Sequence, residues 1–487
     1  MWRGVGKFGV VPLVVLLLVV LSISITSCKP DYNNALPDSS TLGNPRGKRM
    51  LRVITHLHSP YSWDACDQTG TANGILGSTC LNHLKSAVCT NKDDFVFLTD
   101  HPNAMSQYEI KDLLLLEPKD TLLTKNGAPY ANQMGTCANN FSPTLLVGFE
   151  SNLMAMGMTQ HLDPSPDVRS TLYTGNDSTL AGLIRSTGGG LAFIPHTENR
   201  PASGITAIAP DGVEIYNFHA NIDPKIRYTS LNAPPFLDIP GLLTYLIDPY
   251  NELIPDFAFM QFLQVFPQYD SLWNGAIMAG ASATSSGTHI VGIGGTDSHE
   301  NAFPQIVSDG ERLDSHRRIV RFMSNHVIAS SSDADTVKQA IKDGHTWVVF
   351  EGFGTPVQMD FYATLGATVV EMGNPGASLG SQTATITVKA PTLHPDSPGA
   401  NQKQAYLQAP LKPTILLQLS KLAPDGSEAV VATSQNTDIQ YVAKSPGVYL
   451  ANVNIVPQHL APYLGPFKNK AFQAFPWIIT NPIYLDP

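Results

Sequence analysis

The chain contains, at residues 51–58, the stretch Leu51-Arg52-Val53-Ile54-Thr55-His56-Leu57-His58, in which a short apolar run leads into two histidines. Such a run, rich in β-branched residues, is typical of a buried β-strand. Residues two apart on a strand point to the same face, so both imidazoles can reach one metal ion. Asp297 and His299 repeat this spacing after the apolar run 290–293. Because the chain has 14 histidines, one such pair alone is weak evidence.

The same theme, an apolar run that stops at a polar residue, recurs between residues 50 and 350. Further runs occupy residues 95–98, 145–147, 191–194 and 213–216. The polar residues that follow them are Asp100, His101, Glu150, His196 and His219. Uniformly apolar strands indicate a parallel sheet buried on both faces. Helical patterns at 79–88, 177–186 and 333–342 predict an α/β architecture. Chemistry at strand ends favours a β/α barrel, although an open α/β sheet would also place ligands there.

The number of titratable groups at these strand ends predicts metal ions. A lone histidine at a strand end is most often a hydrogen-bonded core residue. Six histidines and two or three carboxylates gathered at one rim would be costly without compensation. Divalent cations remove that cost by binding the carboxylates and neutral imidazoles.

The order of these motifs resembles the polymerase and histidinol phosphatase (PHP) family. The matching segments are His56-Leu57-His58 with Asp64, Phe97-Leu98-Thr99-Asp100-His101, Gly148-Phe149-Glu150, Ala192-Phe193-Ile194-Pro195-His196, Glu214-Ile215-Tyr216-Asn217-Phe218-His219 and Gly295-Thr296-Asp297-Ser298-His299. The resemblance implies a distorted seven-stranded β/α barrel over about residues 50–350. Residues 336–350 are similar to the segment that follows the last metal motif in the carbaryl-hydrolase-like branch.

The resemblance also implies two or three divalent ions, Zn, Mn or Fe, and their ligands. The implied ligands are His56, His58, Glu150 and Asp297 for the first metal, Glu150, His196 and His219 for the second, and Asp64, His101 and His299 for the third. Many members of the family carry a histidine at the position of Asp64, so the third site is expected to be weaker or differently metallated. Asp100 is expected to orient a ligand imidazole.

The implied activity is hydrolysis of a small phosphate monoester or diester, or of a carboxyl or carbamate ester in the looser branch. Water activated by the metals would be the nucleophile. Arg200 could steady a phosphate group and His161 could protonate a leaving group, although both could equally be ordinary loop residues. One alternative is an amidohydrolase barrel, which has no need for Asp64, His101 and His299. Another is a non-catalytic binding lipoprotein, with closed, structural metal sites.

The first residues predict export. Arg3 and Lys7 precede an apolar run at 10–21 and then Ile25-Thr26-Ser27-Cys28, which resembles the lipobox of bacterial lipoproteins. We therefore expect a signal peptide at 1–27 and a lipidated Cys28 that anchors the protein to a membrane of the bacterial cell envelope. Cleavage would leave 28 basic against 40 acidic residues, a net charge of −12. This charge argues against long nucleic acid as a partner. The oligomeric state is left open.

The rest of the chain divides by composition. Residues 28–48 are expected to be a flexible tether, 49–353 the PHP-like barrel, and 354–487 a β-sandwich. Insertions at about 102–143 and 220–285 interrupt the barrel pattern, and the second, rich in aromatic residues, is either a substrate cap or a private packing cluster. Four cysteines remain after Cys28, which favours disulfides in an exported chain. A bond from Cys66 to Cys80 or Cys89 would clamp the loop that carries Asp64.

Overall fold

The structure is a computed structural model that describes residues 32–487 apart from 73–74, 136, 234–238, 249–252, 265–266, 284–288 and 401–410. The predicted signal peptide, Cys28 and the first part of the tether lie outside the described residues. No helix in the described part of the chain combines the length and the apolar character needed to cross a membrane.

Six strands form where the apolar runs predict them. They are β1 (Arg49–Leu57), β4 (Phe95–Leu98), β7 (Thr144–Val147), β10 (Leu191–Ile194), β11 (Gly212–Asn217) and β12 (Val291–Gly295). The pairs β1–β4, β4–β7, β10–β11 and β11–β12 are parallel. Nearly every residue of these strands is buried, as expected for a sheet covered on both faces. The predicted mixed α/β class is confirmed.

The strands from β1 to β12 form a continuous series, and a further bridge connects the segment after β12 to β1. β7 is followed by β8 (Phe149–Glu150) after Gly148 alone, and β8 pairs with β9 (Met154–Met156), which pairs with β10. A Cβ at Gly148 would overlap the carbonyl oxygen of Ala155, so this close approach requires glycine. An isolated parallel bridge, Leu57 to Ser298, joins the end of β1 to the segment after β12. β9 runs antiparallel to both neighbours, which departs from an all-parallel pattern.

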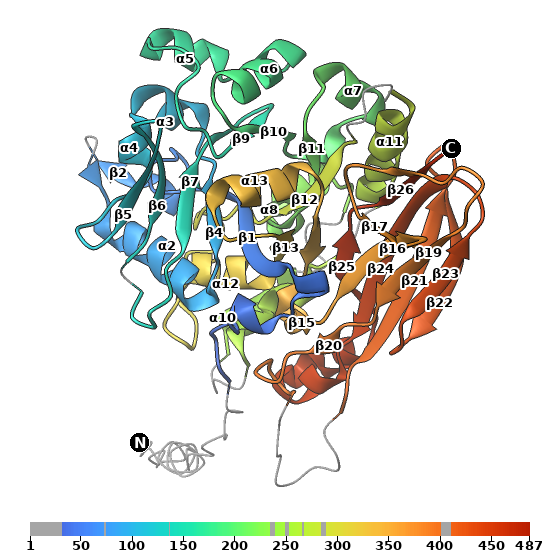
Figure 1. Cartoon of the computed structure of the whole chain (residues 1–487). Coiled ribbons are helices and arrows are strands. Elements are labelled where there is room, and N and C mark those ends of the chain that lie inside the picture. Colours follow the sequence, from blue (N-terminus) through green and yellow to red (C-terminus); the bar gives the residue numbers. More distant parts are fainter. Residues whose placement is uncertain are drawn as a thin grey trace, which may run out of the picture.

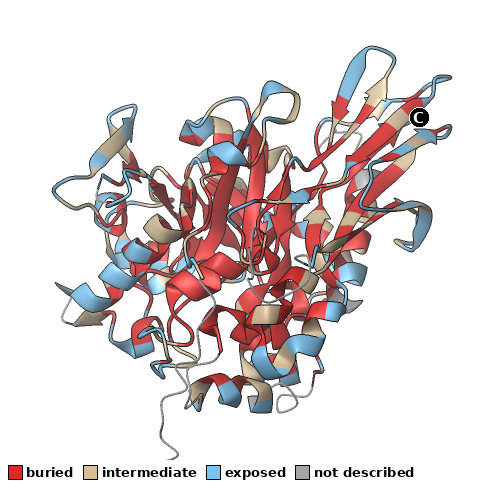
Figure 2. Cartoon of the chain, turned by 90° about the horizontal axis from the view of Figure 1, so that it is seen from below, coloured by how far each residue is buried: buried red, intermediate tan, exposed pale blue. Residues whose placement is uncertain are grey.

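Helices surround these strands (Figure 1). α2 (Ser78–Asn91), α6 (Ser178–Ser186) and α13 (Ala334–Lys342) correspond to the three predicted helices. The Asp177 side chain accepts a hydrogen bond from the backbone N–H of Leu180 and caps α6. Seen from below, buried strands occupy the middle of the molecule, and the exposed residues lie toward its periphery, on outer helices, loops and outer strands (Figure 2).

The two insertions have different structures. The first contains α3 (Pro102–Gln107), α4 (Ile110–Leu113) and the hairpin β5 (Thr121–Lys125) to β6 (Ala128–Gln133). β6 pairs antiparallel with β7, which leaves β5 as the edge strand of the sheet. The second contains α8 (Phe218–Ile222), α9 (Pro224–Thr229), α10 (Ile239–Leu246), η6 (Pro255–Gln261) and α11 (Pro267–Ala283). Its aromatic side chains Phe257, Phe259, Phe262, Tyr269 and Trp273 are buried in the main core. This burial favours the packing interpretation over a substrate cap for these residues.

The described C-terminal strands belong to three sheets, the smallest of which pairs β15 (Pro356–Val357) with β20 (Thr392–Leu393). A four-stranded sheet contains β16 (Asp360–Leu365), β17 (Thr368–Glu371), β19 (Ala384–Lys389) and β23 (Ile439–Ala443). The other strands include β21 (Thr414–Leu422), β22 (Glu428–Gln435), β24 (Gly447–Val456), β25 (Phe475–Thr480) and β26 (Ile483–Asp486). β25 pairs antiparallel with β14 (Thr346–Val349), which pairs with β13 (Ser324–Ala329), the antiparallel neighbour of β1. The C-terminal strands therefore continue the sheet that contains β1.

Candidate metal centre

Two histidine-containing pairs meet because the ends of their strands are hydrogen-bonded to each other. The backbone N–H of Asp297 donates to the carbonyl of His56, and that of His58 donates to the carbonyl of Ser298. The four side chains meet there: Asp297 Oδ1 lies 3.2 Å from His56 Nε2 and 3.4 Å from His299 Nδ1, and the His58 and His299 rings stack. A Cβ at Gly295 would overlap the Glu214 carboxylate, which is why the strand reaches this position through glycine.

The first group gathers around one oxygen of Asp297. Asp297 Oδ1 lies 3.2 Å from His56 Nε2 and 3.1 Å from His58 Nε2. The other oxygen, Oδ2, lies 3.3 Å from His196 Nε2. His56, His196 and Asp297 present ligand atoms within 4.8 Å of one another, and so do His56, His58 and Glu150. These distances fit a shared cation.

The second group gathers around Asp64. Asp64 Oδ2 lies 3.1 Å from His101 Nε2 and 3.4 Å from His299 Nε2. His58 completes this group, and its ring stacks on that of His299 with 3.7 Å between centroids. Glu150 lies between the two groups, with Oε2 3.0 Å from His101 Nδ1 and Oε1 3.6 Å from His196 Nε2. A carboxylate in this position can contact ions in both groups.

The buried ligand atoms fit divalent cations. Asp64 Oδ1, Asp297 Oδ1 and His299 Nε2 are buried and have no hydrogen-bond partner among the described residues. His56 Nε2 and His58 Nε2 face each other at 3.2 Å, although only one of two such nitrogens can donate a proton to the other. Buried polar atoms are normally paired, so an orphaned set of this kind indicates a missing partner. Imidazole and carboxylate donors suit Zn, Mn or Fe.

Two of the ligands have strained backbones. His196 has φ 50° and Asp297 has φ 51°, in the left-handed region that residues other than glycine rarely adopt. Such strain persists only where the surrounding structure enforces it, and it concentrates at functional sites. Here it turns the chain sharply after β10 and β12, so that both side chains face the cluster.

Glu214, a residue to which sequence reasoning gave no role, positions two ligands. Its Oε1 lies 2.8 Å from His56 Nδ1, and its Oε2 accepts hydrogen bonds from the backbone N–H of His196 at 2.9 Å and from Asn217 Nδ2 at 3.1 Å. Asn217 Nδ2 also lies 3.2 Å from Asp297 Oδ2. The signal for Glu214 was its charge within the otherwise apolar run 213–216, because a buried carboxylate requires partners.

Serine hydroxyl groups hydrogen-bond to His58 and to Asp100. Ser62 Oγ lies 2.9 Å from His58 Nδ1, and Asp100 accepts hydrogen bonds from the backbone N–H and Oγ of Ser59, both at 2.6 Å. Asp100 was expected to orient a ligand imidazole directly. Instead its hydrogen bonds fix the backbone immediately after His58.

The carboxylates shift the pKa values of the ligands. Burial lowers the pKa of His101, but Asp64 and Glu150 outweigh burial and raise it to about 11. Burial and the neighbouring His58 hold the pKa of His299 well below its usual value. Burial raises the pKa of Asp297, but His56, His299 and His196 outweigh burial and hold it well below its usual value. A cation bound here would compete with the imidazole protons.

Three predicted residues lie outside these groups. The ring of His219, on α8, is 5.2 Å from that of His299, and His219 belongs to none of the metal-like groups among the described residues. The contacts of His161 include Tyr173 Oη at 3.0 Å and Glu109. Arg200 donates to the carbonyl of Asn152 at 2.9 Å and to Asn176 Oδ1 at 3.3 Å. The roles of all three stay predictions.

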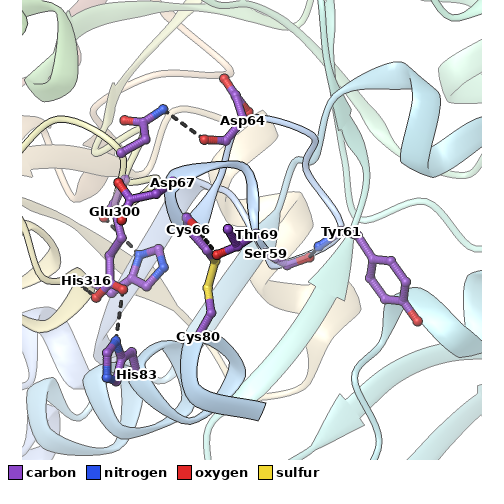
Figure 3. Close-up of a disulfide and its surroundings, with 12 residues drawn as sticks. Ser59, Tyr61, Asp64, Cys66, Asp67, Thr69, Cys80, His83, Glu300 and His316 are labelled. Atoms are coloured by element: carbon purple, nitrogen blue, oxygen red, sulfur yellow. Dashed lines mark hydrogen bonds and ion pairs between the residues drawn. A yellow bond between two sulfur atoms is a disulfide. The ribbon is translucent and has the colours of Figure 1, made fainter. Parts of the chain in front are cut away.

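A disulfide lies beside the second group. Cys66 bonds to Cys80 of α2, one of the two pairings expected from the sequence, and Cys89 bonds to Cys137. Cys66 follows Asp64 by two residues in the sequence, and Figure 3 shows the disulfide that connects this loop to α2. Glu300 and His316 lie close to Cys80 and form a fourth metal-like group with it, but the disulfide occupies the Cys80 sulfur.

The fold and the site thus define a mixed α/β protein with a candidate centre for divalent metal. No protein-family model matches the chain, and no curated protein matches it. Among solved structures, the chain is similar to a two-domain protein containing a predicted PHP-like metal-dependent phosphoesterase from Bacteroides vulgatus ATCC 8482. The identity is 11%, the TM-score is 0.32, and the match covers 92% of this chain and 99% of that chain. PsfC from Pseudomonas syringae PB-5123 is 12% identical with a TM-score of 0.31, over 62% of this chain and 93% of that chain.

Proposed function

We propose that this chain is a metal-dependent hydrolase of ester bonds, with phosphoesters as its first candidate substrates. The observation that carries the proposal is the convergence of imidazoles and carboxylates from separate strand ends on one buried site, where three of their atoms lack hydrogen-bond partners among the described residues. We further infer that the ring of pairings is the distorted seven-stranded barrel of the PHP family, with β7 and β8 acting as one strand.

The residues would share the work as follows. Divalent ions would supply a hydroxide nucleophile near neutral pH and neutralise charge on the phosphoryl oxygens. The Asp297 group would hold one ion and the Asp64 group another, with Glu150 contacting both. Hydrolysis joins the hydroxide oxygen to phosphorus and breaks the bond to the alcohol oxygen, which takes up a proton.

Arg200 favours a phosphoester over a neutral ester. Its two hydrogen bonds go to neutral oxygens, and no carboxylate of the described residues pairs with it within 4.0 Å. Glu150 and Glu198 act on the guanidinium from a distance, but neither makes a direct ion pair with it, so its planar fork is available to phosphate oxygens. Arg200 is therefore proposed to bind the phosphate group.

Activity of the chain without residues 1–28 would test the proposal. The protein, loaded with Mn or Zn, is assayed on p-nitrophenyl phosphate, bis-p-nitrophenyl phosphate and a naphthyl ester. We expect hydrolysis of a phosphate ester. Asp297→Asn should lower the rate of hydrolysis by more than the roughly 10- to 100-fold that removal of a residue supporting a metal ligand causes. The exposed Asp425→Asn is the matched control. Hydrolysis of the naphthyl ester alone would support the carboxyl-ester alternative, and tight metal binding without any hydrolysis would support the binding protein.

Export and lipid anchoring are proposed on the sequence alone. We infer that Cys28 becomes the lipid-modified first residue of a bacterial envelope protein. Mass spectrometry of the N-terminal peptide from membranes of expressing cells would show diacylglycerol on Cys28. An unmodified Cys28 within a longer peptide would refute the anchor.

A further inference from the structure

A cavity lies beside the candidate metal centre. It measures about 740 Å³, and Glu150 and His101 line the end that faces the metal ligands. Trp63, adjacent in sequence to the ligand Asp64, lines it too. The volume lies within the range of small-molecule sites.

Trp63 offers an aromatic surface to whatever enters. Its side chain is 59% exposed, and its ring lies 5.8 Å from the His101 ring at an interplanar angle of 28°. Burying an aromatic side chain of this size is strongly favourable, so an exposed tryptophan next to a reactive centre indicates a ligand contact.

Apart from Pro102, the remaining lining residues carry uncharged polar side chains. Asn103, Ser106 and Gln107 of α3 lie on one part, and Ser170 of α5 (Pro166–Leu172) and Thr174 on another. No lysine or arginine is among the described residues that line the cavity. Amide and hydroxyl groups donate and accept hydrogen bonds, so this wall suits a neutral group that carries several hydroxyls.

We propose that this cavity binds the alcohol part of the substrate as a neutral hydroxylated ring, a sugar or a cyclitol, stacked on Trp63. This inference rests on the proposed function and names its substrate class. An aliphatic ring presents C–H groups to the indole face while its hydroxyls meet the amides. With the ring against Trp63, the ester group reaches the cavity end at Glu150, where the metal ligands lie.

Substrate preference tests this class. The ratio of kcat/KM is measured for glucose 1-phosphate and for inositol 1-phosphate, each relative to glycerol phosphate. We expect a ring phosphate to be preferred, with the better of the two identifying a sugar or a cyclitol. Trp63→Ala is expected to lower that ratio about 5- to 10-fold, and Trp63→Phe to retain most of it. Phe472→Ala, which removes another exposed aromatic side chain, is the control.

Binding without a phosphate separates this inference from the proposed function. Methyl glucoside and inositol are titrated into metal-free protein, and the fluorescence change is compared between the natural chain and Trp63→Phe. Saturable quenching that disappears in the variant supports the ring site even if no ester is hydrolysed. Ester hydrolysis with no such quenching, with a preference for nucleoside monophosphates, or with Trp63→Ala slowing all substrates equally, would overturn it.

Discussion

Glu214 is the buried carboxylate on which the orientation of His56 depends. Donors face both of its oxygens: His56 Nδ1 lies against Oε1, and the N–H groups of His196 and Asn217 point to Oε2. In Glu214→Gln the side-chain NH₂ group faces another N–H donor on one side, which is unfavourable. His56 also loses the negative charge that raises its basicity. We expect metal affinity to fall about 10- to 100-fold while the fold is retained.

Equilibrium dialysis against buffered zinc, with metal analysis of the protein, would measure this change. The exposed Glu428→Gln is the control for a loss of charge. Unchanged affinity in Glu214→Gln would show that His56 is oriented by other groups.

Asp94, which is not one of the metal ligands, makes the stability of the fold depend on pH. Burial raises its pKa to about 6. The backbone N–H of Arg52 and the Ser39 hydroxyl donate hydrogen bonds to it at 2.7 and 2.9 Å, and these bonds oppose the rise. The folded chain therefore keeps a proton that the unfolded chain has already lost between about pH 4 and 6, so Asp94 destabilises the fold as pH rises through this window. Asp94→Asn removes that dependence.

The free energy of unfolding at pH 4.5 and 7.5 would test this effect. Relative to the natural chain, Asp94→Asn is expected to gain about 2 kcal/mol more at pH 7.5 than at pH 4.5. Asp425→Asn, on the surface, should show no such difference. An equal effect of Asp94→Asn at both pH values would mean that the carboxyl group titrates normally.

At the level of the elements, the loop that carries Asp64 is held from two sides. The backbone N–H of Cys66 donates to the carbonyl of His299 at 2.8 Å, and the disulfide ties Cys66 to Cys80 on α2. Closing a loop of this length typically stabilises a protein by about 3 kcal/mol. Cys66→Ser with Cys80→Ser is therefore expected to weaken metal binding at the Asp64 group, while the Asp297 group keeps its ion.

Metal content per chain, measured after dialysis of the double variant, would test the clamp. The control is Cys89→Ser with Cys137→Ser, because neither of these cysteines is within two residues of a ligand, whereas Cys66 is two residues from Asp64; the loop that they close is longer and contains His101. We expect one fewer ion only in the first variant. Equal metal content in both variants would leave the Cys66 disulfide with a purely structural role.

The elements that the sequence predicts well are those with local signals. The run 95–98 is apolar because both faces of β4 are buried, and it ends at polar residues because β4 ends at the site. No such pattern predicts β13, because its residues Ser324, Asn325 and His326 are polar yet buried. Asn325 bonds to the N–H and C=O of Gly294 on β12, a partner that no local pattern reveals. Glu214 did carry a local signal, a charge within an apolar run, but its partners His56 and His196 lie on other strands and are not revealed by that run.

For the whole molecule, hydrogen bonds between strands connect the two sides of the predicted boundary at residue 353, as in the pairing of β14 with β25. Asn481, near the C-terminus, accepts a hydrogen bond from the N–H of Gly292 on β12 and donates to the carbonyls of Gly292 and Thr346. Trp477 is fully buried, and its indole N–H donates to the carbonyl of Gly354. The strands that position the metal ligands therefore depend on the C-terminal region for hydrogen bonds and for cover.

Expression of residues 29–353 alone would expose the edge of β14 and leave the β12 groups that bond Asn481 without partners. Unpaired edges and newly exposed apolar surface promote aggregation, so we expect this fragment to be insoluble or to unfold without cooperativity. Co-expression with residues 354–487 should recover both fragments as one soluble complex that binds metal, which serves as the control for the break in the chain. A soluble 29–353 fragment that unfolds cooperatively and binds metal would instead establish two independent domains, because the hydrogen bonds across residue 353 would then be dispensable for the site.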